Sequence, residues 1–299
     1  MDGKGSPHPV CRLNLVCGKR PSPRACLPAG RGEGRLIGIG DKMKKYEEEI
    51  SDKEFIELYI RFNLGARVNV ATACLNCFSM ADEANKKAIA IEVLSQYIAS
   101  LETLAMIYHA MREKTKQPEK SFLYHYQSIF IKENENAEYS TKKVIEELED
   151  LESQDIDYIR AGLGLPDFKT LKVVPDLIDE NSNEESIKNQ YDAETKTILT
   201  QFKSVLKNRV KDKDGNELNL VNVYNKIKHG YFVIDDKDNG WIKLPIRFEN
   251  ISKDSTRFEY YWYECEEGKV RGLVDKMVII KNHLNDFLSL YLRCLGAFE

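Results

Sequence analysis

The sequence lacks a long hydrophobic run, and it has few cysteines for its length. No apolar stretch approaches the roughly 18 residues needed to cross a bilayer, so we expect no membrane partner. No apolar core of about 7–15 residues precedes a small-residue cleavage site, which excludes a secretory signal peptide. Of the seven cysteines in 299 residues, only Cys74, Cys77, Cys265 and Cys294 lie after residue 42, which does not suit a disulfide scaffold. We therefore predict a cytoplasmic protein.

Motifs for metals and cofactors are also incomplete. "CLNC" (74–77) has the spacing of two zinc ligands, but no second pair supplies the four that a structural site needs, so we expect core packing. "GLGLP" (162–166) lacks the preceding strand and the third glycine of a dinucleotide loop and predicts a turn. The acidic run 146–157 could hold a divalent ion, but such runs are more often a solvated helix face. We expect no metal and no cofactor.

The first 42 residues differ in composition from the rest of the chain. They hold eight Lys and Arg against three Asp and Glu, and they contain eight of the 17 glycines and five of the nine prolines. Such a segment buries too little apolar surface to offset the entropy of ordering. A basic arm or targeting peptide is one interpretation. We expect instead a disordered basic leader, 1–42, which need not belong to the native protein, followed by one domain, 43–299.

Helical periodicity dominates the chain from Ser51 onward. Ser51 and Glu54 have the spacing of a capping box. An apolar stripe follows at helical spacing: Phe55, Leu58, Tyr59, Phe62 and Ala66. Further helices are predicted at about 83–113, 119–133, 138–160, 188–211 and 217–229, with a turn at 162–167, an exposed loop at 179–187 and another turn at "KDKDGN" (211–216).

The period changes after Gly230. The segments "YFVIDD", "GWIKLPIRF" and "RFEYYWYEC" are aromatic and β-branched, which predicts a β-hairpin or three-stranded meander at about 231–265. An amphipathic helix at about 270–296 closes the chain. We predict an all-α fold, a mostly antiparallel helical bundle with a small β insertion before its last helix. The run "EYYWYE" (259–264) could stack a nucleobase, but we expect it to pack the hairpin on the bundle.

Histidines and basic residues supply the other candidate site residues. His109 and His125 lie in or beside apolar stripes, and we expect structural roles for both. Basic residues gather around "NVYNKIKHGYF" (222–232), where interleaved aspartates dilute their field, so a phosphate-facing patch competes with a solvated surface. The basic residues are Lys203, Lys207, Arg209, Lys211, Lys213, Lys226 and Lys228.

Within a helical bundle, "YNKIKHG" (224–230) resembles the signature of HEPN domains, small helical bundles of prokaryotic toxins, antiviral systems and nucleotide-binding helpers. Their pattern is an arginine, a polar residue that is often asparagine, a few variable positions and a histidine. Asn225 matches the polar residue and His229 the histidine. Tyr224 stands where the family has its arginine.

The resemblance implies a metal-independent ribonuclease chemistry in active members, which are usually dimers with facing motifs. It implies that His229, beside Asn225, acts in acid–base chemistry on the RNA 2′-hydroxyl, which suits an imidazole. The family's arginine stabilises charge on the phosphate, and the phenol of Tyr224 cannot replace its planar cation. The competing interpretation of His229 is a helix C-terminal residue followed by Gly230 as a cap.

Three functions follow from these interpretations. The leading one is a HEPN-like homodimer, non-catalytic or weakly active, that binds RNA or a protein partner encoded nearby, in a prokaryotic defence or toxin–antitoxin system. Its binding residues would be Tyr224, Lys226, Lys228, Lys207 and Arg209. The alternatives are an endoribonuclease that uses His229 and Asn225, and a purely structural partner-binding bundle.

Overall fold

A capping box starts the first helical segment, as the sequence predicts. The computed structural model describes residues 49–131, 141–171, 183–207, 210–220, 223, 227, 234–236 and 240–295. The Ser51 hydroxyl accepts a hydrogen bond from the Glu54 backbone N–H (3.2 Å), and the Glu54 carboxylate accepts one from the Ser51 backbone N–H (3.1 Å). The chain continues through α1 (Asp52–Glu54), a π-helical turn η1 (Phe55–Ile60) and α2 (Arg61–Phe78).

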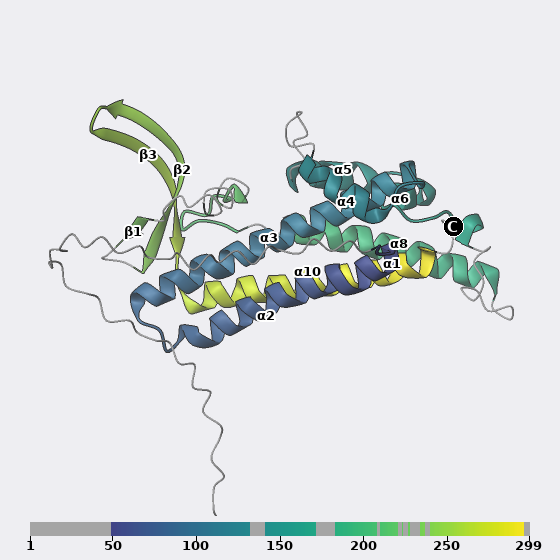
Figure 1. Cartoon of the computed structure of the whole chain (residues 1–299), viewed down its shortest axis with the longest axis horizontal. Helices are drawn as coiled ribbons and strands as arrows, with labels where there is room; N and C mark the ends of the chain where they lie inside the picture. The colour runs from purple at the N-terminus through teal and green to yellow at the C-terminus, as the bar shows by residue number, and fades with distance from the viewer. Residues whose placement is uncertain are drawn as a thin grey trace, which may run out of the picture. The chain divides into compact units, whose positions relative to one another are not determined.

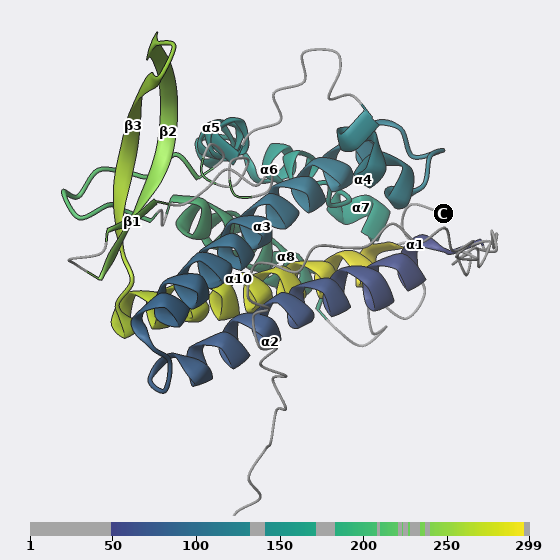
Figure 2. The same ribbon diagram turned by 60° about the vertical axis from the view of Figure 1, so that its left-hand side comes forward.

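Three long helices form the main layer of the bundle. Helix α2 turns into α3 (Glu83–Lys116), whose N-terminus is capped by Asp82. The last helix, α10 (Glu267–Cys294), packs against both of them, and Figures 1 and 2 show the three side by side. Their facing sides are apolar and buried, which accounts for the stability of this layer.

The apolar row indicated by the sequence is buried at Phe55 but exposed farther along, where another row faces the core. Ile56, Ile60, Leu64, Val68 and the apolar residues that continue this row are buried. By contrast, Leu58 is 66% exposed and Phe62 is 73% exposed. The prediction was wrong because this segment is apolar on two faces, and only one of them meets α3 and α10.

A second group of helices covers the other side of α3. It comprises α4 (Phe122–Ile131), α5 (Thr141–Glu152), α6 (Ile156–Gly162), α7 (Phe168–Leu171) and α8 (Glu184–Lys207). The single helix expected at 138–160 is two helices, because the Asp155 carboxylate caps a new start by accepting the Tyr158 backbone N–H at 2.9 Å.

Ion pairs hold this second group together. Arg160 is fully buried, and its guanidinium pairs with Asp157 on its own helix and with Asp192 on α8. The predicted acidic run 146–157 also pairs across helices, since Glu149 contacts Lys207 and Glu152 contacts Lys203. This run is therefore more than a solvated face.

Helix α3 meets the length and composition criteria for a membrane span, although the sequence prediction found no such segment. Of its most apolar stretch, 61% is buried inside the described bundle. Core helices of soluble proteins have the same properties, so the criterion is weak for a single buried helix.

The predicted meander is a three-stranded antiparallel sheet before the last helix. Its strands are β1 (Ile234–Asp236), β2 (Trp241–Ser252) and β3 (Ser255–Glu264), in the order β1-β2-β3. Lys87 of α3 forms an ion pair with Asp235 and donates to the Asp236 carbonyl at 3.0 Å, which anchors β1 to the bundle. The far end of the β2–β3 hairpin extends away from the helices (Figure 1), and the last four residues of β2 are exposed.

Candidate nucleic-acid interface

The register of β2 and β3 separates their aromatic residues onto two faces. Ile242 pairs with Tyr263 and Leu244 pairs with Tyr261, and these side chains pack against the hydrophobic core. The intervening pair, Lys243 and Trp262, lies on the opposite face, because successive residues of a strand point to opposite sides. The prediction that "EYYWYE" packs on the bundle is therefore correct for alternate residues only.

The outer face carries a continuous row of aromatic rings. The ring centroids of Trp241 and Trp262 lie 6.4 Å apart, and those of Trp262 and Tyr260 lie 5.3 Å apart. Phe258 follows at 5.4 Å from Tyr260, and Phe248 lies 6.4 Å from Phe258 across the hairpin. All five side chains are half-buried, so each row member keeps part of its surface open to solvent. Aromatic pairs at these separations also stabilise a hairpin.

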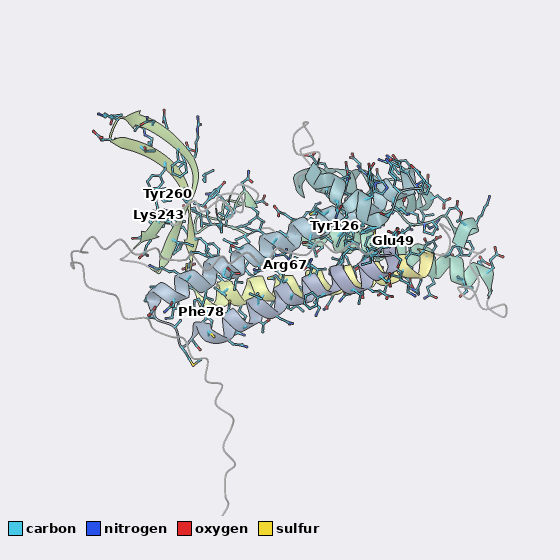
Figure 3. The ribbon with its side chains drawn as sticks, viewed as in Figure 1. Glu49, Arg67, Phe78, Tyr126, Lys243 and Tyr260 are labelled. Carbon is cyan, nitrogen blue, oxygen red and sulfur yellow. The ribbon has the colours of Figure 1, made fainter. Side chains whose placement is uncertain are left out.

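Two lysines lie over these rings. The Lys243 ammonium is 4.7 Å from the Trp262 ring centroid and 5.3 Å from that of Tyr260. Figure 3 shows Lys243 and Tyr260 on the same part of the sheet. The Lys213 ammonium is 4.8 Å from the Trp262 centroid and 5.5 Å from that of Trp241. All four distances fall within the range of cation–π attraction.

We call this surface the aromatic–lysine face. It is defined by Lys213, Trp241, Lys243, Phe248, Phe258, Tyr260 and Trp262.

A tight turn places Lys213 on this face. The Asp212 carboxylate is buried and accepts hydrogen bonds from the backbone N–H groups of Asp214 (2.9 Å) and Asn216 (2.8 Å). Gly215 has φ +84°, a left-handed conformation that glycine adopts without steric cost. A hydrogen bond from the Leu218 N–H to the Val210 carbonyl (2.9 Å) closes the loop. The sequence "KDKDGN" predicts this turn, but it does not predict the rings beneath its lysine.

Charges of both signs surround the aromatic–lysine face. Glu264 lies at the end of the same face, and its carboxylate is balanced by Lys269 at 3.0 Å. Asp212 and Asp214 flank Lys213 in its turn, but the Asp212 carboxylate is occupied by backbone N–H groups. The charged groups that lie over the rings are the ammonium groups of Lys213 and Lys243. Such a surface can bind a planar ring by stacking and a phosphate by the adjacent ammonium groups.

A cavity of about 440 Å³ lies where Trp241 meets the start of α10 and the turn between α2 and α3. Its walls include four glutamates and one lysine, namely Glu83, Glu264, Glu266, Glu267 and Lys86. Three of the carboxylates are paired, with Lys86, Lys269 and Arg271. Within the described ranges, no group of three or more histidine, cysteine or acidic residues could hold a metal ion. The acidic walls disfavour phosphate, so this cavity bounds the aromatic–lysine face at Trp241.

Burial keeps the thiol and hydroxyl groups on the inner face of the sheet unreactive. Burial raises the pKa of the Cys265 thiol to about 12, and it raises the pKa of the Tyr263 hydroxyl above its ordinary value. Both groups therefore stay neutral near pH 7. Near the bundle, the exposed polar groups of the sheet therefore lie on its outer face, whereas Arg247 and Glu259 are exposed farther along the hairpin.

Most of the residues predicted from the sequence to form a site lie outside the described part of the chain. These residues are Tyr224, Asn225, Lys226, Lys228, His229 and Arg209. Lys207 is described and exposed, and its ammonium lies 2.6 Å from the Glu149 carboxylate. This hydrogen bond raises the pKa of Lys207 and lowers that of Glu149, so the pair is charged and balanced. Lys203 is buried and paired with Glu152.

The other candidates divide between confirmation and correction. His125 is buried, and its ring nitrogen lies 3.2 Å from the Gln117 carbonyl, which confirms a structural role. His109 is half-buried in α3. The prediction that the cysteines of "CLNC" pack in the core was wrong for Cys77, which is exposed. Cys74 is partly buried and packs against the core.

Comparisons with protein-family models, with curated proteins and with solved structures found no match to this chain.

Proposed function

We propose that this protein is a HEPN-like, non-catalytic binding protein that takes single-stranded RNA on its aromatic–lysine face. The observation that supports this proposal is the row of five half-buried rings, three of which have a lysine ammonium group within 5.5 Å of their centroids. Each base has an aromatic surface that can stack on such rings, and stacking contributes about 1–3 kcal/mol per base. The lysines supply the charge that a phosphate backbone needs.

A single strand suits this surface better than a duplex does. The bases of a duplex are stacked on one another, whereas those of a single strand are free to stack on a protein. The cations of this face are lysines, and no arginine belongs to it. A lysine ammonium attracts phosphate as a point charge, but it lacks the bidentate geometry with which arginine recognises base edges. We therefore expect binding with little sequence preference.

Both tryptophans of the chain belong to the aromatic–lysine face, which provides a local reporter. A labelled single-stranded RNA of about ten nucleotides, within the usual range of site sizes, should raise fluorescence anisotropy as protein is added. The same titration should quench tryptophan emission, because a stacked base contacts Trp262 or Trp241. Single-stranded DNA and duplex RNA of the same sequence are the comparison ligands, and the duplex should bind more weakly.

Lysine substitutions separate binding from folding better than ring substitutions do, because the rings also hold the hairpin together. The double variant Lys213→Ala with Lys243→Ala should weaken RNA binding. It should also reduce the slope of log affinity against log salt by about 1.4, since each neutralised phosphate of a single strand contributes about 0.7. Lys253→Ala, at the exposed hairpin turn, is the matched control and should retain the affinity.

The other functions give different results in this assay. Unchanged affinity and salt slope in the double variant would refute the proposed face. Failure of every RNA to bind the wild-type protein would favour the partner-binding bundle. Chelator-resistant RNA cleavage that is lost in His229→Ala would favour the endoribonuclease, and Tyr224→Arg would then be expected to increase cleavage by about 10²–10³.

A further inference from the structure

Helix α2 has an apolar outer face in addition to its buried one. Leu58 before the helix is 66% exposed, Phe62 in its first turn is 73% exposed, and Met80 after it is 83% exposed. Asn69 and Asn76, also exposed, lie between them. Large apolar side chains exposed at both ends of one helical segment are typical of an interaction surface rather than of a solvated helix face.

The segment that carries this outer face contains few charged residues. Between Leu58 and Met80 the sequence contains only two charged residues, Arg61 and Arg67. The Arg67 guanidinium is directed to α3, where it donates to the Gln96 side-chain carbonyl at 3.3 Å. In an antiparallel pair with its axis near the middle of this segment, residue 61 of one copy lies far from residue 61 of the other, so like charges do not meet at the axis.

The sizes of the exposed residues vary along the helix in a way that suits antiparallel pairing. The N-terminal half carries Leu58 and Phe62, and the C-terminal half carries the small Ala73 and the neutral Asn76. Near the middle, a Cβ added at Gly65 would meet nothing within 4 Å, so another helix can approach closely. In an antiparallel pair Phe62 of one copy lies on the small or neutral Ala73 and Asn76 of the other, and Leu58 lies on Met80. A parallel pair would place Phe62 against Phe62 and leave the small residues apart.

We infer that a second copy of this chain covers the outer face of α2, with the two helices antiparallel and a two-fold axis near Asn69. Leu58 then lies near Met80 of the second copy, and Phe62 lies near its Asn76. Asn69 meets its own equivalent, and an amide side chain can donate to and accept from an identical amide. This surface differs from the 224–230 segment through which the sequence resemblance predicts a dimer, and it does not depend on RNA binding.

The contact area sets the expected strength. From Leu58 to Met80 the chain rises about 33 Å at 1.5 Å per residue, and a helix is about 10 Å wide. Such a strip is smaller than the roughly 800 Å² per partner of a standard interface. We therefore expect a dissociation constant in the micromolar range and a dimer that dissociates on dilution.

Sedimentation of the full chain from about 1 to 100 µM tests this inference, since a micromolar constant predicts a shift from monomer to dimer over that range. Phe62→Glu should weaken association at least roughly tenfold, because an unpaired carboxylate would be buried at the interface. The fold should persist, since Phe62 is exposed in the monomer. Ile251→Glu, an exposed apolar position at the hairpin end, is the matched control and should associate as the wild type does.

Cross-linking tests the orientation. Under mild oxidation Asn69→Cys should give a dimer with a 69–69 disulfide, identified by peptide mapping. The native Cys77 should not link to its own equivalent, because eight residues from the axis on each copy separate the two thiols by about 24 Å. A monomer at every concentration, a dimer that survives Phe62→Glu, or a 77–77 disulfide without a 69–69 disulfide would each overturn the inference.

Discussion

The turn that carries Lys213 provides the most informative test of the candidate site, because it connects local structure to binding. Asp212 is 8% exposed, and its carboxylate accepts the backbone N–H groups of Asp214 and Asn216 and, at 3.2 Å, the Asn216 side-chain amide. Asp212→Ala removes both acceptor oxygens and with them all three hydrogen bonds. The loop should then lose its fixed conformation, and Lys213 should leave its position over Trp262.

The expected magnitude follows from the hydrogen bonds that are lost. A hydrogen bond to a charged group contributes about 1.5–3 kcal/mol, and water can replace part of it at a turn. We therefore expect Asp212→Ala to lower the free energy of unfolding by about 2–3 kcal/mol. Loss of the cation–π contact adds about 0.5–1 kcal/mol. RNA affinity should fall to the level of Lys213→Ala, because both variants remove the same ammonium from the rings.

Urea denaturation followed by tryptophan fluorescence measures the stability, and anisotropy with labelled RNA measures the affinity. Asp214→Ala is the matched control, since the turn uses the backbone of Asp214 and its side chain is exposed. Asp212→Asn keeps one acceptor oxygen for the two backbone N–H groups and should lie between wild type and Asp212→Ala. Wild-type stability and affinity in Asp212→Ala would refute the idea that this turn holds Lys213 on the face.

Three further predictions concern the bundle. Asp192→Ala should lower the free energy of unfolding by about 3–5 kcal/mol, because it leaves the buried charge of Arg160 short of a partner. Arg160→Met removes the charge itself and should lower the free energy of unfolding by less. Equal losses of stability in the two variants, measured by denaturation, would contradict this explanation. Alkylation at pH 8 followed by peptide mapping should label exposed Cys77 quickly and Cys265 slowly, since burial raises the pKa of Cys265 to about 12; equal rates would show that the sheet opens. Lys207→Ala should change stability by less than about 1 kcal/mol, because exposed ion pairs contribute little, and a larger loss in the same denaturation assay would contradict this.

The sequence predicts the order and type of the main elements because their signals are local. The capping box, the long apolar stripe of α3 and the turn residues before the sheet each act over a few residues. The break within the predicted helix 138–160 is also local, since Ser153 and Asp155 are typical of helix ends and starts. That signal was present, but the apolar period on both sides of it suggested a continuous helix.

The orientation of α2 is a different kind of problem, because it depends on partners that are distant in the sequence. One row, Ile60, Leu64 and Val68, is buried, and another, Leu58 and Phe62, is exposed. Both rows have helical spacing and similar hydrophobicity, so periodicity cannot choose between them. The choice is made by α3 and α10, which can cover only one side. The sequence therefore predicts the helix correctly and its buried face wrongly.

The aromatic run of β3 has the same ambiguity, but here the sequence contains the information that resolves it. Tyr260 and Trp262 alternate with Tyr261 and Tyr263, and hydrophobicity alone does not show which pair faces the solvent. Lys243 lies directly across from Trp262, and a lysine without a charged partner is rarely buried. The face that contains Lys243 must therefore be the solvent face, and its rings must be the ones available to a ligand. A correct register between the two strands would have been sufficient to predict most of the aromatic–lysine face, whereas Lys213 comes from a separate loop and requires the three-dimensional structure.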